Sequence, residues 1–530
     1  MSSLFRRCTV LGLLVGAIRL LAPLPVFAQS PAKRPSLVVL ITIDQMRADY
    51  LDRFASQMHG GLARLANGGA RFTDAHHDHA ITETAPGHAS LLSGRFPRST
   101  GIMMNRIGVD DADAPLTAGA YGTGASPKRF IGTTFADWLR AANARTRTLS
   151  VSMKDRGAIL PIGRSKSDVY WYSADGRFTT STYYRDALPK WVNGFNERRL
   201  PQSYAGKSWT LLLPDVAYAE TDSVPVEGGG IDVVFPHRLP TDPIDAGSLV
   251  RATPFMDDLV LAFALHGVSS MALGTTSTQT DLLAISLSAT DVIGHRYGPD
   301  SREIHDQILR VDRALGGFLD SLYALRDSTT VTIVLTGDHG VGTIPELAPD
   351  SIQPRPTRVK LYGLLTPLIA RMVAAKVDTN AIDLDEQILL MNRTMFKNQA
   401  FADSLVDAFA VAARQQPGVS RVDRFHALFA DTLSDPIARR WAHQFPATAQ
   451  IELVITLTKF STFGGNVASH GSPYNYDSNV PLIFYGAGIA PGRHVEFVRT
   501  VDIAPTLAAL VGVKVGERVD GVVLQVGSKP

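Results

Sequence analysis

The sequence predicts an α/β fold in which helices cover both faces of a mostly parallel, doubly wound sheet, with cap segments inserted into it. First, several short runs of Val, Ile and Leu are continuous rather than alternating, which is typical of strands buried on both faces. Second, amphipathic segments lie between these runs, and such alternation favours an open α/β sheet. Third, the 530 residues are 45% hydrophobic and 19% charged, a globular composition that can bury a large core.

Five apolar runs are expected to form strands, and two segments with helical periodicity are expected to pack between them. The runs occupy residues 36–43, 149–153, 282–288, 329–335 and 480–485. In residues 135–142, Phe135, Trp138 and Leu139 share one helical face. In residues 304–322, apolar residues recur at alternating steps of four and three, which is the spacing of a long amphipathic helix.

Two further segments, about 165–275 and about 345–465, lack this alternation of strands and helices. Both are rich in Pro, Gly and aromatic residues. We interpret them as insertions or a cap rather than as parts of the sheet. The chain from residue 29 to residue 530 is then expected to form one domain that carries both insertions.

The first 28 residues are typical of a secretory signal peptide. Two arginines at positions 6–7 precede an apolar run over residues 10–26, and Ala28 supplies a small residue at the expected cleavage site. Arg19 lies inside the run and disfavours a membrane-spanning helix. The single cysteine, Cys8, also lies in this leader, so the mature chain is expected to have no disulfide and no cysteine nucleophile or metal ligand.

Charge and hydropathy argue against a nucleic-acid-binding protein and against a membrane-spanning protein. The 52 basic and 50 acidic residues give a net charge of +2, whereas nucleic-acid-binding proteins usually carry a basic excess. After the leader, no stretch reaches the roughly 18 apolar residues of a spanning helix. We therefore expect an exported protein, periplasmic or secreted, without a membrane span and without nucleic-acid binding.

Carboxylate and imidazole side chains follow the predicted strands or lie close to them. The set comprises Asp44, Asp291, His295, Asp338, His339 and His470. In doubly wound sheets the ligand site lies beyond the carboxyl ends of the strands, so these side chains are expected to converge on one cleft. Oxygen and nitrogen ligands without cysteine suit zinc most readily. A single Asp after a strand is more often a turn residue or a helix cap. The prediction of a metal site therefore depends on the recurrence of Asp and His near several strands.

Residues 82–90 contain a candidate nucleophile. Pro86 suits the first turn of a helix, so Thr84 is expected just before a helix N-terminus, where the helix dipole favours an alkoxide. A threonine hydroxyl is a poor nucleophile unless a base or a metal ion activates it. Without the Asp and His set, Thr84 would be interpreted as a helix N-cap.

Together these motifs resemble the alkaline phosphatase superfamily, most closely the PafA-type periplasmic alkaline phosphatases that use a threonine nucleophile. The matching segments follow the family's order from residue 36 onward, and the two insertions carry no resemblance. Besides the six Asp and His positions, they are Thr84-Ala85-Pro86-Gly87-His88, Gly101-Ile102-Met103-Met104-Asn105 and Lys154-Asp155-Arg156-Gly157-Ala158.

The resemblance implies two zinc ions per chain and a set of groups that bind phosphate. One zinc ion would be held by Asp291, His295 and His470. The other would be held by Asp44, Asp338 and His339, with Thr84 at this second ion. The phosphoryl oxygens would be contacted by Asn105, Lys154 and Arg156.

The function implied is that of an exported alkaline phosphatase that hydrolyses small phosphate monoesters through a phosphothreonine intermediate. Lys154 and Arg156 favour a dianionic monoester, because a diester brings one charge less and a second organic group. Two alternatives stay open. One is a phosphodiesterase or nucleotide pyrophosphatase of the same superfamily, and the other is a non-catalytic exported protein that binds metal or phosphate.

A cluster of His76, His77, Asp78 and His79 has no counterpart that we recognise in the family. We expect it to lie on the surface; a feature of the site's rim and an adventitious metal site are the alternatives. The sequence does not predict the oligomeric state.

Overall fold

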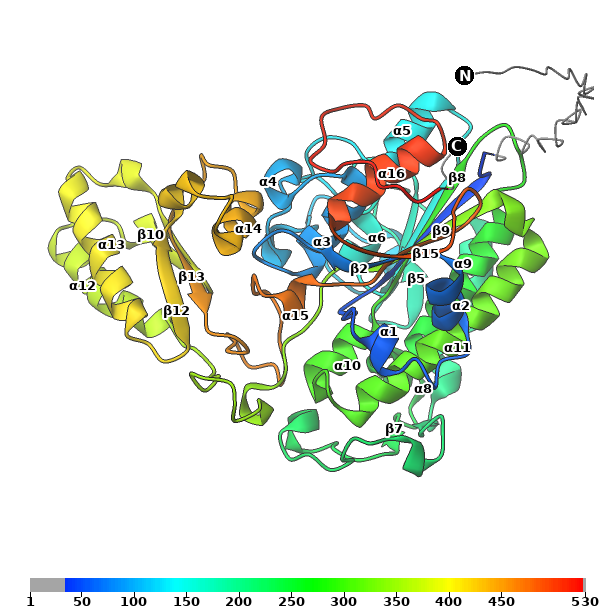
Figure 1. Cartoon of the computed structure of the whole chain (residues 1–530), viewed down its shortest axis with the longest axis horizontal. Helices are drawn as coiled ribbons and strands as arrows, with labels where there is room; N and C mark the ends of the chain where they lie inside the picture. The colour runs from blue at the N-terminus through cyan, green and yellow to red at the C-terminus, as the bar shows by residue number, and fades with distance from the viewer. Residues whose placement is uncertain (1–33, 528–530) are drawn as a thin grey trace, which may run out of the picture. The chain divides into compact units, whose positions relative to one another are not determined.

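A computed structural model describes residues 34–527, so the expected signal peptide lies outside the described residues. The fold centres on a nine-stranded sheet with the strand order β15-β2-β14-β9-β1-β8-β3-β4-β5 (Figure 1). Its strands are β1 (Leu37–Ile43), β2 (Ala70–His76), β3 (Thr148–Ser152), β4 (Asp168–Ser173), β5 (Arg177–Thr179), β8 (Asp281–Leu287), β9 (Val331–Gly337), β14 (Leu482–Gly486) and β15 (Gly492–Arg499). This architecture confirms the predicted fold class.

The centre of the sheet is parallel, and its register aligns the ends of three strands. β1 pairs in parallel with both β8 and β9, so that Ile43 lies opposite Leu287 on one side and Gly337 on the other. β14 runs antiparallel to β9 and to β2, and β5 runs antiparallel to β4. The residues that follow β1, β8 and β9 therefore emerge side by side at one edge of the sheet.

Strand β1 is continuous in its hydrophobicity because each face packs into a different core. Leu37, Val39 and Ile41 belong to one buried cluster, whereas Val38 and Leu40 belong to another. The first cluster is covered by α2 (Gly61–Gly68), α9 (Phe255–Ser270) and α11 (Arg302–Leu325). The second is covered by α3 (Thr84–Ser93), α5 (Phe135–Ala142), α6 (Asp155–Ile159) and α16 (Ile503–Leu510).

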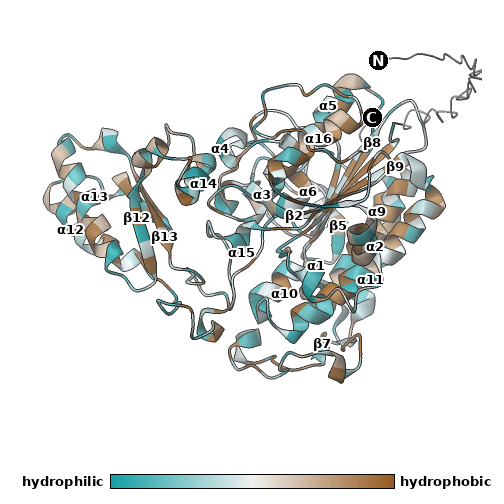
Figure 2. Ribbon diagram, viewed as in Figure 1, coloured by the Kyte–Doolittle hydropathy of each residue, from teal (hydrophilic) through white to brown (hydrophobic). Residues whose placement is uncertain are grey.

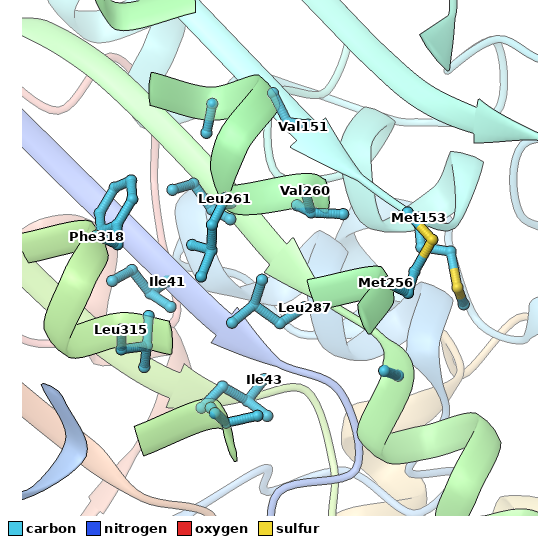
Figure 3. Packing of buried hydrophobic residues seen from close by; sticks show 14 of the residues in the cluster. Ile41, Ile43, Val151, Met153, Met256, Val260, Leu261, Leu287, Leu315 and Phe318 are labelled. Carbon is cyan, nitrogen blue, oxygen red and sulfur yellow. The ribbon is translucent and has the colours of Figure 1, made fainter. Parts of the chain in front are cut away.

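The helix α11 shows how its sequence pattern serves this packing. Leu315 and Phe318 of α11 lie beside Ile41 of β1 (Figure 3). The predicted steps of four and three thus place one apolar stripe on the sheet. In Figure 2 the central strands are mainly hydrophobic, whereas α11 carries both hydrophobic and hydrophilic residues, as expected for a helix with one face toward solvent.

The segment of residues 165–275 differs from the sequence-based interpretation. β4 and β5 lie within it and extend the nine-stranded sheet, and α9 packs on that sheet, so the expectation that this segment lies outside the sheet is wrong for these elements. Aromatic residues such as those of β4 occur in strands as well as in caps, so they do not distinguish the two. Between β5 and α9 lie α7 (Lys190–Glu197), α8 (Pro243–Leu249) and a short ladder of β6 (Ser208–Trp209) with β7 (His237–Arg238).

The segment of residues 345–465, which we call the cap, builds a second sheet of four antiparallel strands in the order β10-β11-β13-β12. The strands are β10 (Ile382–Asp385), β11 (Ile388–Met391), β12 (Val419–Arg424) and β13 (Ile451–Leu457). The helices α12 (Leu365–Ala374) and α13 (Gln399–Arg414) pack on one face (Figure 1). On the other face, Val454 of β13 packs with Trp441 of α14 (Pro436–Gln444). Both belong to a buried cluster that also contains Ile81 and Met104. The cap is therefore fixed to the rest of the fold, which we call the body, through an apolar contact.

Within the part of the chain that the structure describes, no helix combines the length and the apolar character needed to cross a membrane.

Candidate active site

The aligned ends of β1, β8 and β9 bring the candidate metal ligands together. Asp44 directly follows β1, and its backbone N–H donates to the carbonyl oxygen of Leu287 at 2.8 Å. Asp291 lies in the first turn of α10 (Ala289–Tyr297), which follows β8. Asp338 and His339 directly follow β9, and His470 comes from the loop after β13. The sheet register is thus the physical reason that residues almost 300 positions apart meet.

Asp291, His295 and His470 form the first group, with ligand atoms all within 4.8 Å of one another. His295 Nε2 lies 3.1 Å from His470 Nε2 and 3.3 Å from Asp291 Oδ1. Each imidazole donates from Nδ1 to a backbone carbonyl, His295 to Ala468 at 2.8 Å and His470 to Thr82 at 2.7 Å. Both Nε2 atoms are therefore lone-pair acceptors that face each other and a carboxylate, an arrangement that a cation satisfies.

Asp44, Asp291 and His339 form a second group by the same distance criterion. His339 Nε2 lies 3.5 Å from Asp44 Oδ1 and 3.6 Å from Asp338 Oδ2, and its Nδ1 donates to the carbonyl of Gly340 at 2.9 Å. Asp44 Oδ1 is buried and forms no hydrogen bond with the described residues, whereas Asp338 Oδ2 lies 3.2 Å from His88 Nδ1. A buried carboxylate oxygen without a hydrogen-bond donor is costly, so this donor set fits a divalent cation.

The electrostatics of these carboxylates follow from burial and from their neighbours. Burial raises the pKa of Asp44, and the nearby carboxylate of Asp338 raises it further. Burial acts in the same direction on Asp291, but Lys154 and His295 outweigh it and lower the pKa of Asp291. The same balance lowers the pKa of Asp338, where His339 and His88 outweigh burial.

Thr84 lies against His339 of the second group. It is the first residue of α3, with Glu83 as the N-cap, so the helix begins one residue earlier than the sequence predicted. Thr84 Oγ1 lies 3.5 Å from His339 Nε2 and 3.4 Å from Lys154 Nζ. A Cβ atom at Gly87 would lie 2.3 Å from the carbonyl oxygen of Asp338, so glycine is required there for α3 to approach the metal ligands this closely.

Lys154 lies deeper in the site than we expected from its predicted contact with phosphoryl oxygens. Its Nζ is 2.5 Å from Asp44 Oδ2 and 2.6 Å from Asp291 Oδ2. Burial acts to lower the pKa of Lys154, but Asp291 and Asp44 outweigh it and raise the pKa, so the amine carries its charge among the carboxylates of the candidate metal ligands. The same Nζ still lies within 3.4 Å of the Thr84 hydroxyl.

Asn105 and Arg156 retain free donors. The backbone N–H of Ala85 donates to Asn105 Oδ1 at 2.8 Å, which fixes the amide orientation and leaves Nδ2 as a donor without a partner among the described residues. The nearest carboxylate oxygen to the Arg156 guanidinium is Asp155 Oδ1, at 3.8 Å, and Arg156 Nε forms no hydrogen bond with the described residues. Free N–H groups of this kind are suited to bind an anion.

Three positioning residues were missed by the sequence analysis. Gln45 donates from its backbone N–H to Asp338 Oδ1 at 3.0 Å and from Nε2 to Asp291 Oδ1 at 2.9 Å, so it connects Asp338 to Asp291, which both groups share. His88 Nδ1 lies 3.0 Å from the carbonyl oxygen of Thr84 and 3.2 Å from Asp338 Oδ2. The carboxylate of Glu83 accepts from the backbone N–H of Asn105 at 2.6 Å. Only His88 had a sequence signal, because it belongs to the Thr84 motif.

The cluster of His76, His77, Asp78 and His79 is buried, so the expectation that it lies on the surface is wrong. His77 Nε2 donates to the carbonyl oxygen of Gly337, directly before Asp338, at 2.9 Å. Asp78 accepts from Arg439 of the cap helix α14 at 3.0 Å. The physical reason is that distant parts of the chain cover this cluster: Arg439 of α14 contacts Asp78, and Thr500 lies 3.0 Å from His77 Nδ1. Local sequence does not reveal such long-range contacts.

Comparison with known proteins is consistent with this geometry. The sequence model of the type I phosphodiesterase / nucleotide pyrophosphatase family matches residues 38–360, more than half of the chain. The chain belongs to this family. The match includes every candidate site residue except His470.

Individual relatives make the assignment more specific. Alkaline phosphatase PhoV of Synechococcus elongatus is 32% identical over 516 residues, which cover 92% of each chain. Alkaline phosphatase PafA of Elizabethkingia meningoseptica is 29% identical over 506 residues, 91% of this chain and 92% of PafA. The crystal structure of wild-type PafA matches with a TM-score of 0.80 at 28% identity and covers 91% of this chain and 96% of PafA. The predicted resemblance to PafA-type phosphatases is confirmed, and the chain is an alkaline phosphatase-like hydrolase.

Proposed function

We propose that this protein is an exported, zinc-dependent alkaline phosphatase that hydrolyses phosphate monoesters through a phosphothreonine at Thr84. The observation that carries the proposal is the position of Thr84 Oγ1, 3.5 Å from His339 Nε2 of the second group and 3.4 Å from Lys154 Nζ. The alkaline phosphatase names of its relatives support the same activity.

The residues around Thr84 suit it to attack phosphorus. The Lys154 ammonium stabilises an alkoxide at Oγ1, and the N-terminal dipole of α3 acts in the same direction. Two zinc ions, held by the two groups, would supply Lewis-acid stabilisation of the attacking and leaving oxygens. Attack forms the bond from Oγ1 to phosphorus while the bond from phosphorus to the leaving oxygen breaks. Water then displaces Thr84, which releases phosphate and restores the hydroxyl.

Asn105 and Arg156 favour a monoester over a diester. Both present N–H groups that form no hydrogen bond with the described residues, and a monoester dianion offers three non-bridging oxygens to receive them. A diester replaces one of these oxygens with an ester group and loses one negative charge. The positive charge of Arg156 is then balanced less well by the substrate, and the second ester group must be accommodated close to Arg156.

Phosphodiester hydrolysis is the second candidate function, because the matched family is described by phosphodiesterase and nucleotide pyrophosphatase activities. The two candidates share Thr84 and both ligand groups. They differ in what Arg156 contributes, since only the monoester brings the full dianionic charge.

Paired substrates test the choice. An aryl phosphate and the matching methyl aryl phosphate share a leaving group, so their kcat/KM ratio reports the preference for a monoester. We expect wild type to prefer the monoester, and Arg156→Ala to lower kcat/KM for the monoester about 10- to 150-fold but to affect the diester less. The exposed Arg164, replaced by Ala, is the matched control. A wild-type preference for the diester would overturn the proposal.

Two further parts of the proposal have direct measurements. Metal analysis of the purified protein should give two zinc ions per chain. Cell fractionation and N-terminal sequencing should find the protein outside the cytoplasm, with its leader of 28 residues removed. Retention in the cytoplasm with an intact N-terminus would contradict the export assignment.

A further inference from the structure

We propose that a groove in the cap binds the leaving group of the substrate, and that it selects phosphate monoesters of alcohols that carry an aromatic ring. This inference rests on the proposed phosphomonoesterase function and adds a substrate class to it. The groove encloses about 610 Å³, within the usual range of small-molecule sites. Its lining includes Lys360, Tyr362, Glu386, Phe463 and Gly465.

Two lining residues of the groove also line a crevice that borders the site. Glu386 and Phe463 also line a narrow crevice of about 30 Å³ that is bordered by His470, a member of the first ligand group. The backbone also connects the groove to the first ligand group. Gly465 lines the groove, and the side-chain amide of the next residue, Asn466, lies 3.2 Å from His295 Nδ1.

The groove lies on the side from which the leaving group would depart. Thr84 Oγ1 lies close to His339, in the second ligand group. In an in-line displacement the leaving oxygen departs opposite the attacking oxygen, toward the first group, which contains His295 and His470. A substituent on that oxygen therefore extends toward the chain segment that leads from His470 back to the groove.

The chemistry of the lining defines the occupant. Tyr362 is 61% exposed and Phe463 is half-buried against the cap core, so both can offer ring surface to a ligand. Lys360 is exposed and forms no ion pair with the described residues, so the lining offers a cation in addition to these rings. Aromatic rings bind such surfaces by stacking and by cation–π contact.

Matched alkyl esters test the groove separately from the chemical step. Propyl phosphate and 3-phenylpropyl phosphate have leaving alcohols of nearly equal acidity, so their kcat/KM ratio reports contacts of the ring. We expect wild type to prefer the phenyl ester. Tyr362→Ala should lower this preference about two- to twelve-fold, while Tyr362→Phe should retain it.

The exposed Tyr121, which lies outside the cap, provides the control variant Tyr121→Ala and should retain the preference. Hydrolysis of both esters with no phenyl preference in wild type, or with the same preference in Tyr362→Ala, would overturn the groove assignment alone. Failure of the wild-type enzyme to hydrolyse either ester would instead contradict the proposed function on which the groove depends.

Discussion

Asp78 joins the body to the cap through a buried ion pair, and its replacement by Asn should loosen that connection. The carboxylate is 2% exposed and lies 3.0 Å from the guanidinium of Arg439, while Arg440 approaches to 3.5 Å. Burial alone would raise the pKa of Asp78, but hydrogen bonds from His443 and Arg439 lower it to about 2. The ionised form is therefore the one that the folded protein stabilises.

The pKa gives the magnitude of this stabilisation. A fall from 3.8 in the unfolded chain to about 2 in the folded protein corresponds to about 2 kcal/mol of unfolding free energy at neutral pH. Because the folded-state pKa is the lower one, the contribution is complete above pH 3.8 and is lost as the pH falls through about 2. Asp78→Asn should thus unfold at lower denaturant concentration than wild type at pH 7. The difference between the two proteins in the free energy of unfolding should become smaller below pH 4.

Urea denaturation of both proteins, followed by fluorescence, measures the effect. Asp74→Asn is the matched control, because Asp74 pairs with His76 but is 48% exposed and should contribute less than about 1 kcal/mol. An Asp78→Asn variant that unfolds together with wild type at pH 7 would refute the claim that this ion pair stabilises the contact between cap and body.

Two predictions concern the site itself. Asn105→Ala should lower kcat/KM for a phosphate monoester about 10- to 150-fold, since it removes a hydrogen bond to a charged oxygen; a change below three-fold in steady-state assays would contradict the role of Asn105. His88→Gln should weaken metal binding about 10- to 100-fold, because His88 orients Asp338; chelator competition measures this, with the exposed His59→Gln as control, and equal affinities would show that His88 has no such role.

The central strands could be predicted because their hydrophobicity is a local signal. β1, β8 and β9 are buried on both faces, and this produces the continuous apolar runs. β2 and β15 were missed because they carry charged and polar residues such as Arg71 and Glu496, so that no apolar run marks them. β4 was misinterpreted because Tyr170 and Trp171 occur both in strands and in caps.

The positions of the site residues relative to the predicted strands indicated which residues would lie close together. These positions did not predict the individual side-chain contacts. Asp44 and Asp338 could be brought together because both follow parallel strands, and the register of those strands aligns their ends. The contact of Lys154 with Asp44 depends on how a long side chain turns, which no spacing encodes. The burial of Asp78 depends on a cap helix more than 350 residues away in sequence, and His77 contacts Gly337 and Thr500, which are also distant in sequence.

The identity of the nucleophile is the most direct test of the proposed mechanism. Acid quenching of wild type during turnover of a phosphate monoester, followed by mass spectrometry of its peptides, should locate a phosphoryl group on Thr84. Thr84→Ala should lose both this modification and turnover while it still binds close to two zinc ions per chain. Undiminished turnover by Thr84→Ala, or a phosphoryl group on a different residue, would contradict the assignment.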